Sequence, residues 1–433
     1  MLTVITIINY IDRGAIAYAG EFIIEEYGLD LKSWGQILGF FGYGYMLGGL
    51  FGGILADKKG AKFLWIIAVT TWSLFEIVTA FAGDIGLTLF GGSALIGFAV
   101  FRILFGAAEG PSFTAINRTV ANWSAPGEKA FLLSLGHVGV PIGALLTAPV
   151  AVFLISIVGW KGMFVVLGVL GLIWVLVWAK IFTDYPENHP RVSKEELAEI
   201  RSSEELLESE NALEISQHTN TSWYHFFKNP TLVLNALGYF GTNYVSFLIL
   251  TWTPIYLQDV FHYNLSSLWY LGMIPWIGAC ITCPLGAKLS DLLRQKTNNL
   301  RLARTGISII SYFLTAVCFL IILTVHSPGA VLFLMFLGTS FTYLNSTLFW
   351  AIVLDTEPSR AGAYGGILHF FGAFASLLAP TLTGFLVMNY GYTSMFISVV
   401  VAALFTMVCM VFVKPGKRVK EKFSSESQEV SLN

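Results

Sequence analysis

The chain has 433 residues, of which 55% are hydrophobic and only 12% are charged, and its formal net charge is −2. Soluble domains carry about 25% charged residues, so the composition excludes an ordinary soluble protein, and the near-neutral charge argues against a nucleic-acid partner. Apolar stretches of about 20 residues, each long enough to cross a hydrocarbon core of about 30 Å, recur along nearly the whole length. The sequence therefore predicts an all-α protein that crosses a lipid bilayer many times.

Glycines, prolines and clusters of charge divide the apolar sequence into twelve predicted spans. In chain order the spans cover residues 2–24, 35–55, 63–83, 92–114, 130–156, 162–182, 229–257, 267–287, 305–325, 330–353, 363–388 and 393–413. A polar, acidic stretch separates the first six spans from the last six. We predict that it is a solvated linker, with a short helix that begins at a capping box from Ser193 to Glu196. The predicted parts are an N-terminal six-helix bundle at 1–182, a cytoplasmic linker at 183–228, a C-terminal six-helix bundle at 229–413 and a cytoplasmic tail at 414–433.

The basic residues predict the orientation in the membrane. An even number of spans puts both termini on one side, and cytoplasmic loops are rich in Lys and Arg. If the termini are cytoplasmic, nearly all of the 25 Lys and Arg lie on that side; Lys32 and Lys161 fall in the opposite loops, and Arg13 and Arg102 lie within spans. The sequence therefore predicts a multi-pass protein of the cell membrane with both termini in the cytoplasm.

Four ionisable residues are placed where a bilayer disfavours them. Asp12 and Arg13 lie in the middle of the first span, and Arg102 and Glu109 lie in the fourth. A charge at the bilayer centre costs about 3 kcal/mol on insertion scales, so such residues face the inside of a bundle and mark a pathway for a charged solute. We predict a polar site between helices.

Arg13 is the best candidate for an anion ligand. A guanidinium meets a carboxylate through two parallel hydrogen bonds and keeps its charge in a low-dielectric site. The alternative is a structural salt bridge from Arg13 to Asp12 or Glu109. Neighbouring residues on a helix point about 100° apart, so Asp12 and Arg13 cannot easily satisfy each other alone.

Asp12 and Glu109 are the candidates for proton carriers. Burial disfavours an ionised carboxylate and a nearby arginine favours it, so a conformational change can switch protonation. The alternative is that both stay ionised as partners of Arg102 and Arg13. Arg102 and Glu109 are two helical turns apart, about 10 Å along the axis, which favours Arg102 as an electrostatic partner over a direct substrate ligand.

Weaker candidates surround these charges. The side chains that could hydrogen-bond a hydroxylated substrate are Tyr10, Tyr45, Asn243 and Tyr244, with His137 and His369 weaker still. Packing is the alternative for each aromatic residue. Glu76 in the third span either faces a cavity or reaches toward the interface. The pair Cys280 and Cys283 has apolar flanks that favour packing over zinc or redox chemistry, so we predict no metal and no cofactor.

The two halves repeat in part. Asn9 and Tyr10 recur as Asn243 and Tyr244, and Asp57 recurs as Asp291 at the same offset, as a six-helix duplication predicts. The charged residues do not recur: at that offset Ser246 and Phe247 replace Asp12 and Arg13, and Phe336 and Tyr343 replace Arg102 and Glu109. The charged chemistry therefore belongs to the N-terminal half.

The loop after the second span runs Gly-Ile-Leu-Ala-Asp-Lys-Lys-Gly-Ala-Lys over residues 53–62 and resembles the loop signature of the major facilitator superfamily. The resemblance implies two six-helix bundles related by a pseudo-two-fold axis. It also implies a cytoplasmic latch, the gating motif, which consists of Gly53, Asp57, Lys58, Gly60 and Lys62, with Asp291 as its counterpart in the second half. An ordinary basic turn is the alternative for the loop.

Within that superfamily the chain resembles the anion:cation symporter family of sugar-acid and sialin-like carriers. The stretches that carry the resemblance are Asn9 to Arg13, Tyr45 with Asp57, Arg102 to Gly110, Trp123 to Lys129, and Trp252 to Leu257. His369 lies near a position where the family often presents an asparagine. The resemblance favours proton coupling through Asp12 and Glu109, with Arg102 as their electrostatic partner.

The favoured function is proton-coupled symport of a small organic anion, such as a hexonate or hexuronate, by alternating access in a monomer without enzymatic activity. One alternative is an antiporter of drugs or phosphorylated sugars, for which Gly136, Gly139, Pro141 and Gly143 offer a loose match to an antiporter signature. A phosphate ester would be expected to recruit more than one basic residue, and the C-terminal half offers none within its spans. A receptor or an intramembrane enzyme is the remaining alternative, although no catalytic constellation and no sizeable soluble domain stands out.

Overall fold

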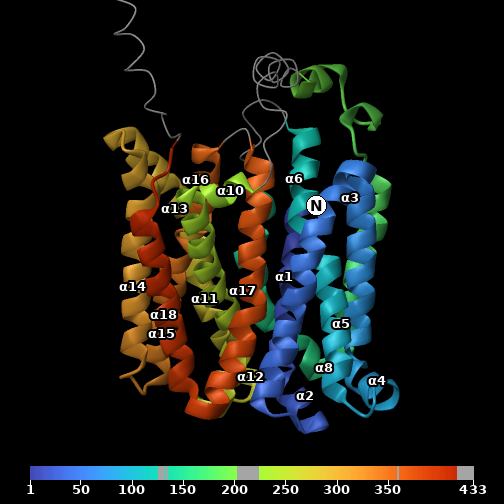
Figure 1. Cartoon of the computed structure of the whole chain (residues 1–433). Helices are drawn as coiled ribbons and strands as arrows, with labels where there is room; N and C mark the ends of the chain where they lie inside the picture. The colour runs from blue at the N-terminus through green and yellow to red at the C-terminus, as the bar shows by residue number, and fades with distance from the viewer. Residues whose placement is uncertain (125–131, 133–134, 202–223, 358–359, 417–433) are drawn as a thin grey trace, which may run out of the picture.

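The computed structural model describes residues 1–124, 132, 135–201, 224–357 and 360–416. The side chains at 53, 54, 56, 57 and 361–363 lie outside this description. The described residues form helices and no strands, as Figure 1 shows.

The N-terminal half is one helical bundle. Its helices are α1 (Leu2–Tyr18), α2 (Gly20–Tyr27), α3 (Leu31–Thr79), α4 (Ala82–Leu89), α5 (Ala94–Glu109), α6 (Ser112–Trp123) and α8 (Gly139–Ile181), followed by the 3₁₀ turn η1 (Pro186–Asn188). The linker helix at 194–201 begins as predicted, because the Ser193 hydroxyl accepts a hydrogen bond from the backbone nitrogen of Glu196 at 3.1 Å.

The C-terminal half is a second helical bundle. Its helices are α10 (His225–Lys228), α11 (Pro230–Phe261), α12 (Leu265–Leu271), α13 (Ile274–Thr297), the π-helical turn η2 (Leu302–Gly306), α14 (Ile307–Ile322), α15 (Pro328–Tyr343), α16 (Leu348–Thr356), α17 (Ala361–Tyr390) and α18 (Tyr392–Phe412). Figure 1 shows the start of α1 and the end of α18 at the same end of the molecule.

The predicted all-α fold of twelve spans in two six-helix bundles is confirmed. Nine helical stretches of described residues are long and apolar enough to cross a membrane, and the stretch Leu135–Ile181 has the length of two spans. Glycines with positive φ divide the two long helices: Gly60 (φ 81°, ψ 168°) breaks α3, and Gly159 (φ 73°, ψ 171°) breaks α8. Only glycine adopts this backbone region readily, so these two positions end one span and start the next.

The fourth predicted span, 92–114, is two helices instead of one. Helix α5 ends at Glu109, and Pro111 lies immediately before α6. A backbone N–H at the start of a helix has no partner within that helix, so the proline, which lacks an N–H, costs no hydrogen bond there. The Ser112 hydroxyl donates to the carbonyl of Glu109 at 2.6 Å across the break. The break places the Glu109 carboxylate at the end of a helix deep inside the bundle.

Small residues on α3 let it approach two other helices closely. A Cβ added at Gly44 or Gly48 would lie 1.8 Å or 2.1 Å from the backbone oxygens of Ile103 and Ala107 in α5. Along a different part of α3, a Cβ at Gly35 would lie 2.7 Å from a backbone oxygen of α17. Spacings of this kind allow tight helix packing in membranes. Helix α3 therefore fixes α5 within its own bundle and also joins the N-terminal bundle to α17.

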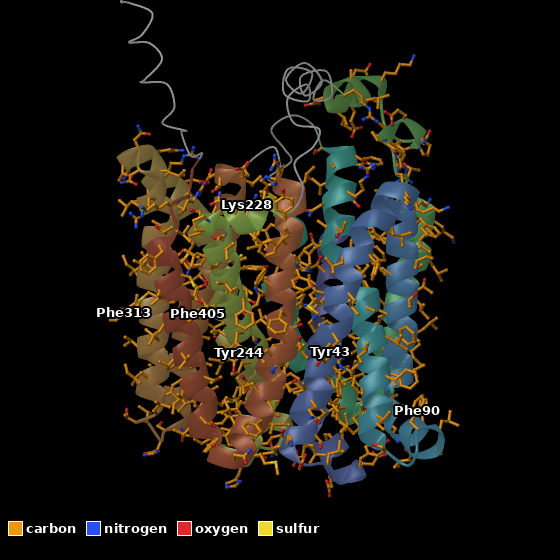
Figure 2. All side chains as sticks on the ribbon, in the orientation of Figure 1. Tyr43, Phe90, Lys228, Tyr244, Phe313 and Phe405 are labelled. Atoms are coloured by element: carbon orange, nitrogen blue, oxygen red, sulfur yellow. The ribbon has the colours of Figure 1, made fainter. Side chains whose placement is uncertain are left out.

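Large apolar side chains cover the outside of the bundles. Figure 2 labels Phe313 on α14 and Phe405 on α18, which are 53% and 41% exposed. Such exposed apolar residues are expected where a helix faces lipid instead of water.

Candidate functional site

A cluster of five ionisable side chains lies inside the N-terminal bundle. Asp12 and Arg13 come from α1, Glu76 from α3, and Arg102 and Glu109 from α5. Each is at most 2% exposed. We call these five residues the charged cluster. Three carboxyl groups and two guanidinium groups meet here, shielded from solvent, so the pairing among them decides which groups stay ionised.

Arg13 and Glu109 form the closed ion pair of the cluster. The Nη2 and Nε atoms of Arg13 both donate to the same carboxylate oxygen, Oε2 of Glu109, at 2.8 Å and 3.2 Å. Nη2 also donates to Oδ1 of Asn9 at 3.2 Å, one turn away on α1. Among the described residues, neither Nη1 of Arg13 nor Oε1 of Glu109 has a hydrogen-bond partner. The pair is therefore not the two-bond fork, and half of each group stays available.

Aromatic rings enclose the Arg13 guanidinium. Its central carbon lies 4.4 Å from the ring centre of Tyr45, 4.6 Å from that of Tyr10 and 4.8 Å from that of Phe41. Phe247, from α11 in the other bundle, lies at 5.8 Å. Cation–π contacts of this kind are worth about 2 kcal/mol when desolvated. They hold Arg13 in place whether or not Glu109 is bound to it.

Arg102 is held differently. Its guanidinium carbon lies 5.2 Å from the ring centres of both Phe41 and Phe105. Its Nε and Nη1 atoms make no hydrogen bond with a described residue, and the same is true of both oxygens of Asp12 and of Glu76. Glu76 is attracted electrostatically by Arg102 and repels Asp12. This half of the cluster interacts through charge without direct hydrogen bonds.

A small cavity of about 30 Å³ lies between the two bundles, next to Arg13. Its lining residues are Tyr10, Arg13, Tyr45, Phe113, Tyr239, Asn243, Phe247, His369, Gly372 and Ala373, from α1, α3, α6, α11 and α17. Ligand pockets usually measure about 300–1,000 Å³, so this arrangement encloses the site tightly. In this arrangement the cavity is too small to hold a sugar-sized solute.

The structure brings together most of the residues that the sequence singled out. Tyr10, Arg13, Tyr45, Asn243 and His369 all line the cavity. His369 also packs edge-on against Tyr45, with ring centres 5.4 Å apart.

Tyr244, in contrast, does not line the cavity. It is buried beside Thr383 and Ser398, on the face of α11 that is turned away from the cavity. The physical reason is the helical rotation of about 100° between neighbours, which lets Asn243 face the site and turns Tyr244 away.

Sequence reasoning missed five of the lining residues, Phe113, Tyr239, Phe247, Gly372 and Ala373. Tyr239 could have been found, because it lies four residues before Asn243 and so on the same helical face. Its backbone oxygen accepts a hydrogen bond of 2.8 Å from the Asn243 amide. The other four are ordinary apolar or small residues whose position becomes apparent only when the helices are packed.

The gating motif is described in part. Gly53 and Asp57 lie in α3 at positions whose side chains fall outside the described residues, and Lys58 is exposed. Gly60 forms the break, and the backbone nitrogen of Lys62 donates to Oδ1 of Asp184 at 2.7 Å.

The counterpart in the second half, Asp291, belongs to an ion-pair network. It accepts a bond of 3.0 Å from Nη1 of Arg304, whose Nε donates to Asp355 at 2.8 Å. Arg294 lies 3.5 Å from the other oxygen of Asp355. The network ties α13 to η2 and α16 at the end of the bundle that carries the chain termini.

No group of three His, Cys, Asp or Glu side chains able to hold a metal ion occurs within the described part of the chain. Cys280 and Cys283 are free thiols on α13, and the Cys283 sulfur lies 3.1 Å from the Ser346 hydroxyl.

Two helical bundles enclose a cavity at their interface, and a buried charged cluster lies beside it in the N-terminal bundle, an arrangement that fits a membrane transporter. The model of the Major Facilitator Superfamily matches residues 2–380, and the chain belongs to this family. It is a transporter and not an enzyme.

Relatives cover nearly the whole chain. The chain is 29% identical over 414 residues to a hexuronate transporter of Bacillus subtilis strain 168, a match that covers 94% of this chain and 92% of the relative. It is 28% identical to a probable galactarate/D-glucarate transporter of the same organism, over 100% of this chain and 94% of the relative. It is 27% identical to human sialin, over 83% of this chain and 70% of sialin. The resemblance to sugar-acid and sialin-like carriers is thereby confirmed.

Solved structures show the same fold. A bacterial homologue of the human lysosomal transporter Spinster, inward-facing and occupied, matches with a TM-score of 0.71 at 16% identity, over 95% of this chain and 94% of that one. A D-xylose–proton symporter matches with a TM-score of 0.71 at 14% identity, over 96% of both chains.

Proposed function

We propose that this transporter takes up a small organic anion of the hexuronate or hexonate class together with protons, by alternating access, from a site centred on Arg13. The observation that carries the proposal is the half-used guanidinium: Arg13 lines the cavity between the bundles, yet engages a single oxygen of Glu109. A substrate carboxylate can replace Glu109 on Arg13 and form the two-bond fork that the internal pair lacks.

The lining of the cavity suits a hydroxylated anion. Tyr10, Tyr45 and Tyr239 carry hydroxyls and Asn243 carries an amide oxygen, in a wall whose other residues are Arg13, Phe113, Phe247, His369, Gly372 and Ala373. Polar groups of this number, placed in an apolar pocket, fix the orientation of a small ligand. The relatives named for hexuronate and for galactarate and D-glucarate support the same substrate class.

Exchange at Arg13 provides a route to coupling. When Glu109 leaves Arg13 without a new partner, its buried charge is uncompensated, which is unfavourable unless the carboxylate takes up a proton. Protonation of Glu109 and binding of a substrate carboxylate to Arg13 therefore favour each other. Because the coupling is reciprocal, substrate binding promotes proton binding to the same extent.

We also propose the orientation of the transporter in the membrane, with both termini in the cytoplasm. With the termini in the cytoplasm, the end of the molecule that carries α2, α4 and α12 in Figure 1 faces outward, and protons and substrate enter from there. The gating motif then lies at the cytoplasmic end, where it holds the bundles together in one of the two access states.

The experiment is uptake into proteoliposomes under an inward proton gradient. Labelled D-glucuronate and D-gluconate should accumulate above the external concentration, and a protonophore should abolish the accumulation. Glucose and glucose 6-phosphate are the controls for an uncharged and a phosphorylated sugar. Equal accumulation with and without the gradient would rule out proton coupling, and preference for glucose 6-phosphate would favour the antiporter of phosphorylated sugars instead.

A further inference from the structure

Glu76 is a buried acid that the exchange at Arg13 does not use. It lies on α3 one turn before that helix ends at Thr79, and it is 0% exposed. Neither of its carboxyl oxygens has a hydrogen-bond partner among the described residues. A buried carboxylate without partners carries a large penalty, so the position requires a charge-based explanation.

The groups that face Glu76 come from two neighbouring helices. Helix α1 presents Asp12, and α5 presents Arg102 and Glu109, all three of which act on Glu76 electrostatically. On the side of α8, Gly171 packs against the hydroxyl of Ser73, one turn before Glu76 on α3. Within the described part of the chain, the charged neighbours of Glu76 outside the closed pair are thus one acid, Asp12, and one guanidinium, Arg102, because Glu109 is already bound to Arg13.

The balance of the buried charges indicates how many protons Asp12 and Glu76 carry together. With the Arg13–Glu109 pair closed, Asp12 and Glu76 remain opposite Arg102 alone among the described residues. If both acids were ionised, one buried negative charge would have no counter-ion, which costs several kcal/mol. If both were protonated, Arg102 would be the uncompensated charge. The neutral arrangement has one proton on the two acids, and acids coupled in this way titrate as a unit.

Glu76 and Asp12 lie at different depths along their helices. Helix α3 continues from Thr79 into the turn before α4, at the end of the molecule opposite the termini (Figure 1). Asp12 lies deeper, six residues before the end of α1 at Tyr18. The indole of Trp72, which is buried on α3, lies beside Asp12. Glu76 is therefore the member of the pair nearer that end.

We propose that Glu76 and Asp12 hold one exchangeable proton between them, with Arg102 as their shared counter-ion, so that Glu76 is a proton-storing residue of the transport cycle. The proton moves from the carboxylic acid of Glu76 to the carboxylate of Asp12, which leaves the total charge unchanged. The inference rests on the proposed proton coupling. In the transport cycle, Glu76 keeps Asp12 able to accept a proton, because without Glu76 the full charge of Arg102 would hold Asp12 ionised.

The first test is Glu76→Gln, with the exposed Glu25→Gln as the matched control. The substitution leaves Asp12 as the one acid opposite Arg102, so we expect the pH at half-maximal gradient-driven uptake to fall by about one unit or more. The glutamine keeps the size of the side chain, so thermal stability should stay near wild type and counterflow exchange should persist at least in part. An unchanged pH profile in a folded, exchanging Glu76→Gln protein would mean that Glu76 is a permanently neutral packing residue, and the inference would be wrong.

The second test does not depend on transport or on the folding of Glu76→Gln. Infrared difference spectroscopy of wild-type protein without substrate, at a pH where the Arg13–Glu109 pair is closed, should show the C=O stretch of one buried protonated carboxyl. Asp12→Asn leaves Glu76 alone opposite Arg102, so Glu76 becomes ionised and this band should disappear. A band that persists in Asp12→Asn contradicts a shared proton. If wild-type protein shows the expected band and its loss but no proton-driven uptake, the proposed function fails and the shared proton stands.

Discussion

The carboxylate of Asp184, three residues after the end of α8, accepts a hydrogen bond of 2.7 Å from the backbone nitrogen of Lys62 in α3. Lys62 lies just after the break at Gly60, where the nitrogens of a starting helix have no partner within the helix. Asp184 thus acts as a cap supplied by another part of the chain. It joins the sixth span to the start of the third at the gating motif.

Gly60→Ala tests this junction. Gly60 has a φ of 81°, and an added Cβ would lie 2.8 Å from the Asp184 carboxylate. Backbone strain of this kind costs about 1–3 kcal/mol, and displacement of Asp184 removes the cap as well. We expect a lower melting temperature in detergent. Gly366→Ala, on an exposed part of α17 where an added Cβ meets nothing within 4 Å, is the control and should melt like wild type. Equal melting of both variants would show that the junction tolerates a side chain.

The fold could be predicted from the sequence because hydropathy, averaged over about 20 residues, identifies the segments that are apolar enough to insert into the bilayer. The same averaging hides single-residue breaks: the end of α5 at Glu109 escaped detection, because a window of about 20 residues does not register one glycine and one proline. The cap by Asp184 was also missed, since it joins residues far apart in the chain.

The charged residues of the site could be predicted from the sequence, but which of them pair could not. An isolated charge within an apolar span is visible in the sequence, which is how Arg13 and Glu109 were found. Which groups pair is decided by helix packing: the salt bridge from Arg13 to Glu109, weighed as an alternative to anion binding, is present. Its incomplete geometry is compatible with both roles, so substrate binding by Arg13 stays a prediction.

Gly372→Ala tests the cavity. An added Cβ would lie 2.5 Å from Cε1 of Tyr239 and 3.0 Å from Nδ2 of Asn243. These side chains must shift into the space beside Arg13, so we expect at least a roughly tenfold rise in the dissociation constant for D-glucuronate, with a loss of stability of about 1–3 kcal/mol from overpacking. Isothermal titration on purified protein measures the constant, and Gly366→Ala on the same helix is the control. Wild-type affinity in Gly372→Ala would place the substrate elsewhere.

Lys161→Gln tests the end of the bundle that carries α2 and α4. The Lys161 ammonium lies 2.7 Å from Glu26 and 2.9 Å from Asp84, and its hydrogen bond holds the pKa of the Asp84 carboxyl below the usual range. A lowered pKa contributes stability that is present at neutral pH and is lost as the pH falls through that pKa. These side chains are partly exposed, so we expect a loss below about 1 kcal/mol. Melting curves should differ from wild type at pH 7 and converge below about pH 4; a difference that is constant with pH would contradict the assignment.

Arg13→Lys tests the anion ligand. A lysine keeps the positive charge near Glu109 and the cation–π contacts, but it cannot form two parallel hydrogen bonds to a carboxylate. The loss of a hydrogen bond to a charged group is worth about 1.5–3 kcal/mol, which corresponds to a dissociation constant roughly ten- to a hundredfold higher. Thermal-shift titration with D-glucuronate measures the constant. Arg294→Lys, which changes an exposed pair with Asp355, is the control. Unchanged affinity in Arg13→Lys would remove Arg13 from the binding site.

Glu109→Gln and Asp12→Asn test whether these acids carry the driving proton. Each amide keeps the size of the side chain it replaces, and the amide oxygen in Glu109→Gln can still accept a hydrogen bond from Arg13. Neither variant can take up and release a proton at the substituted position, so we expect accumulation driven by a pH gradient to be lost. Exchange of labelled for unlabelled substrate needs no net proton movement and should survive at least in part.

A purely structural Glu109 predicts another outcome: Arg13 would lose its counter-ion inside the bundle, and folding and both activities would decline together. Uptake and counterflow, measured on the same proteoliposomes with Glu25→Gln as the control, separate the two. Full gradient-driven accumulation by both variants would end the assignment of proton coupling to this pair.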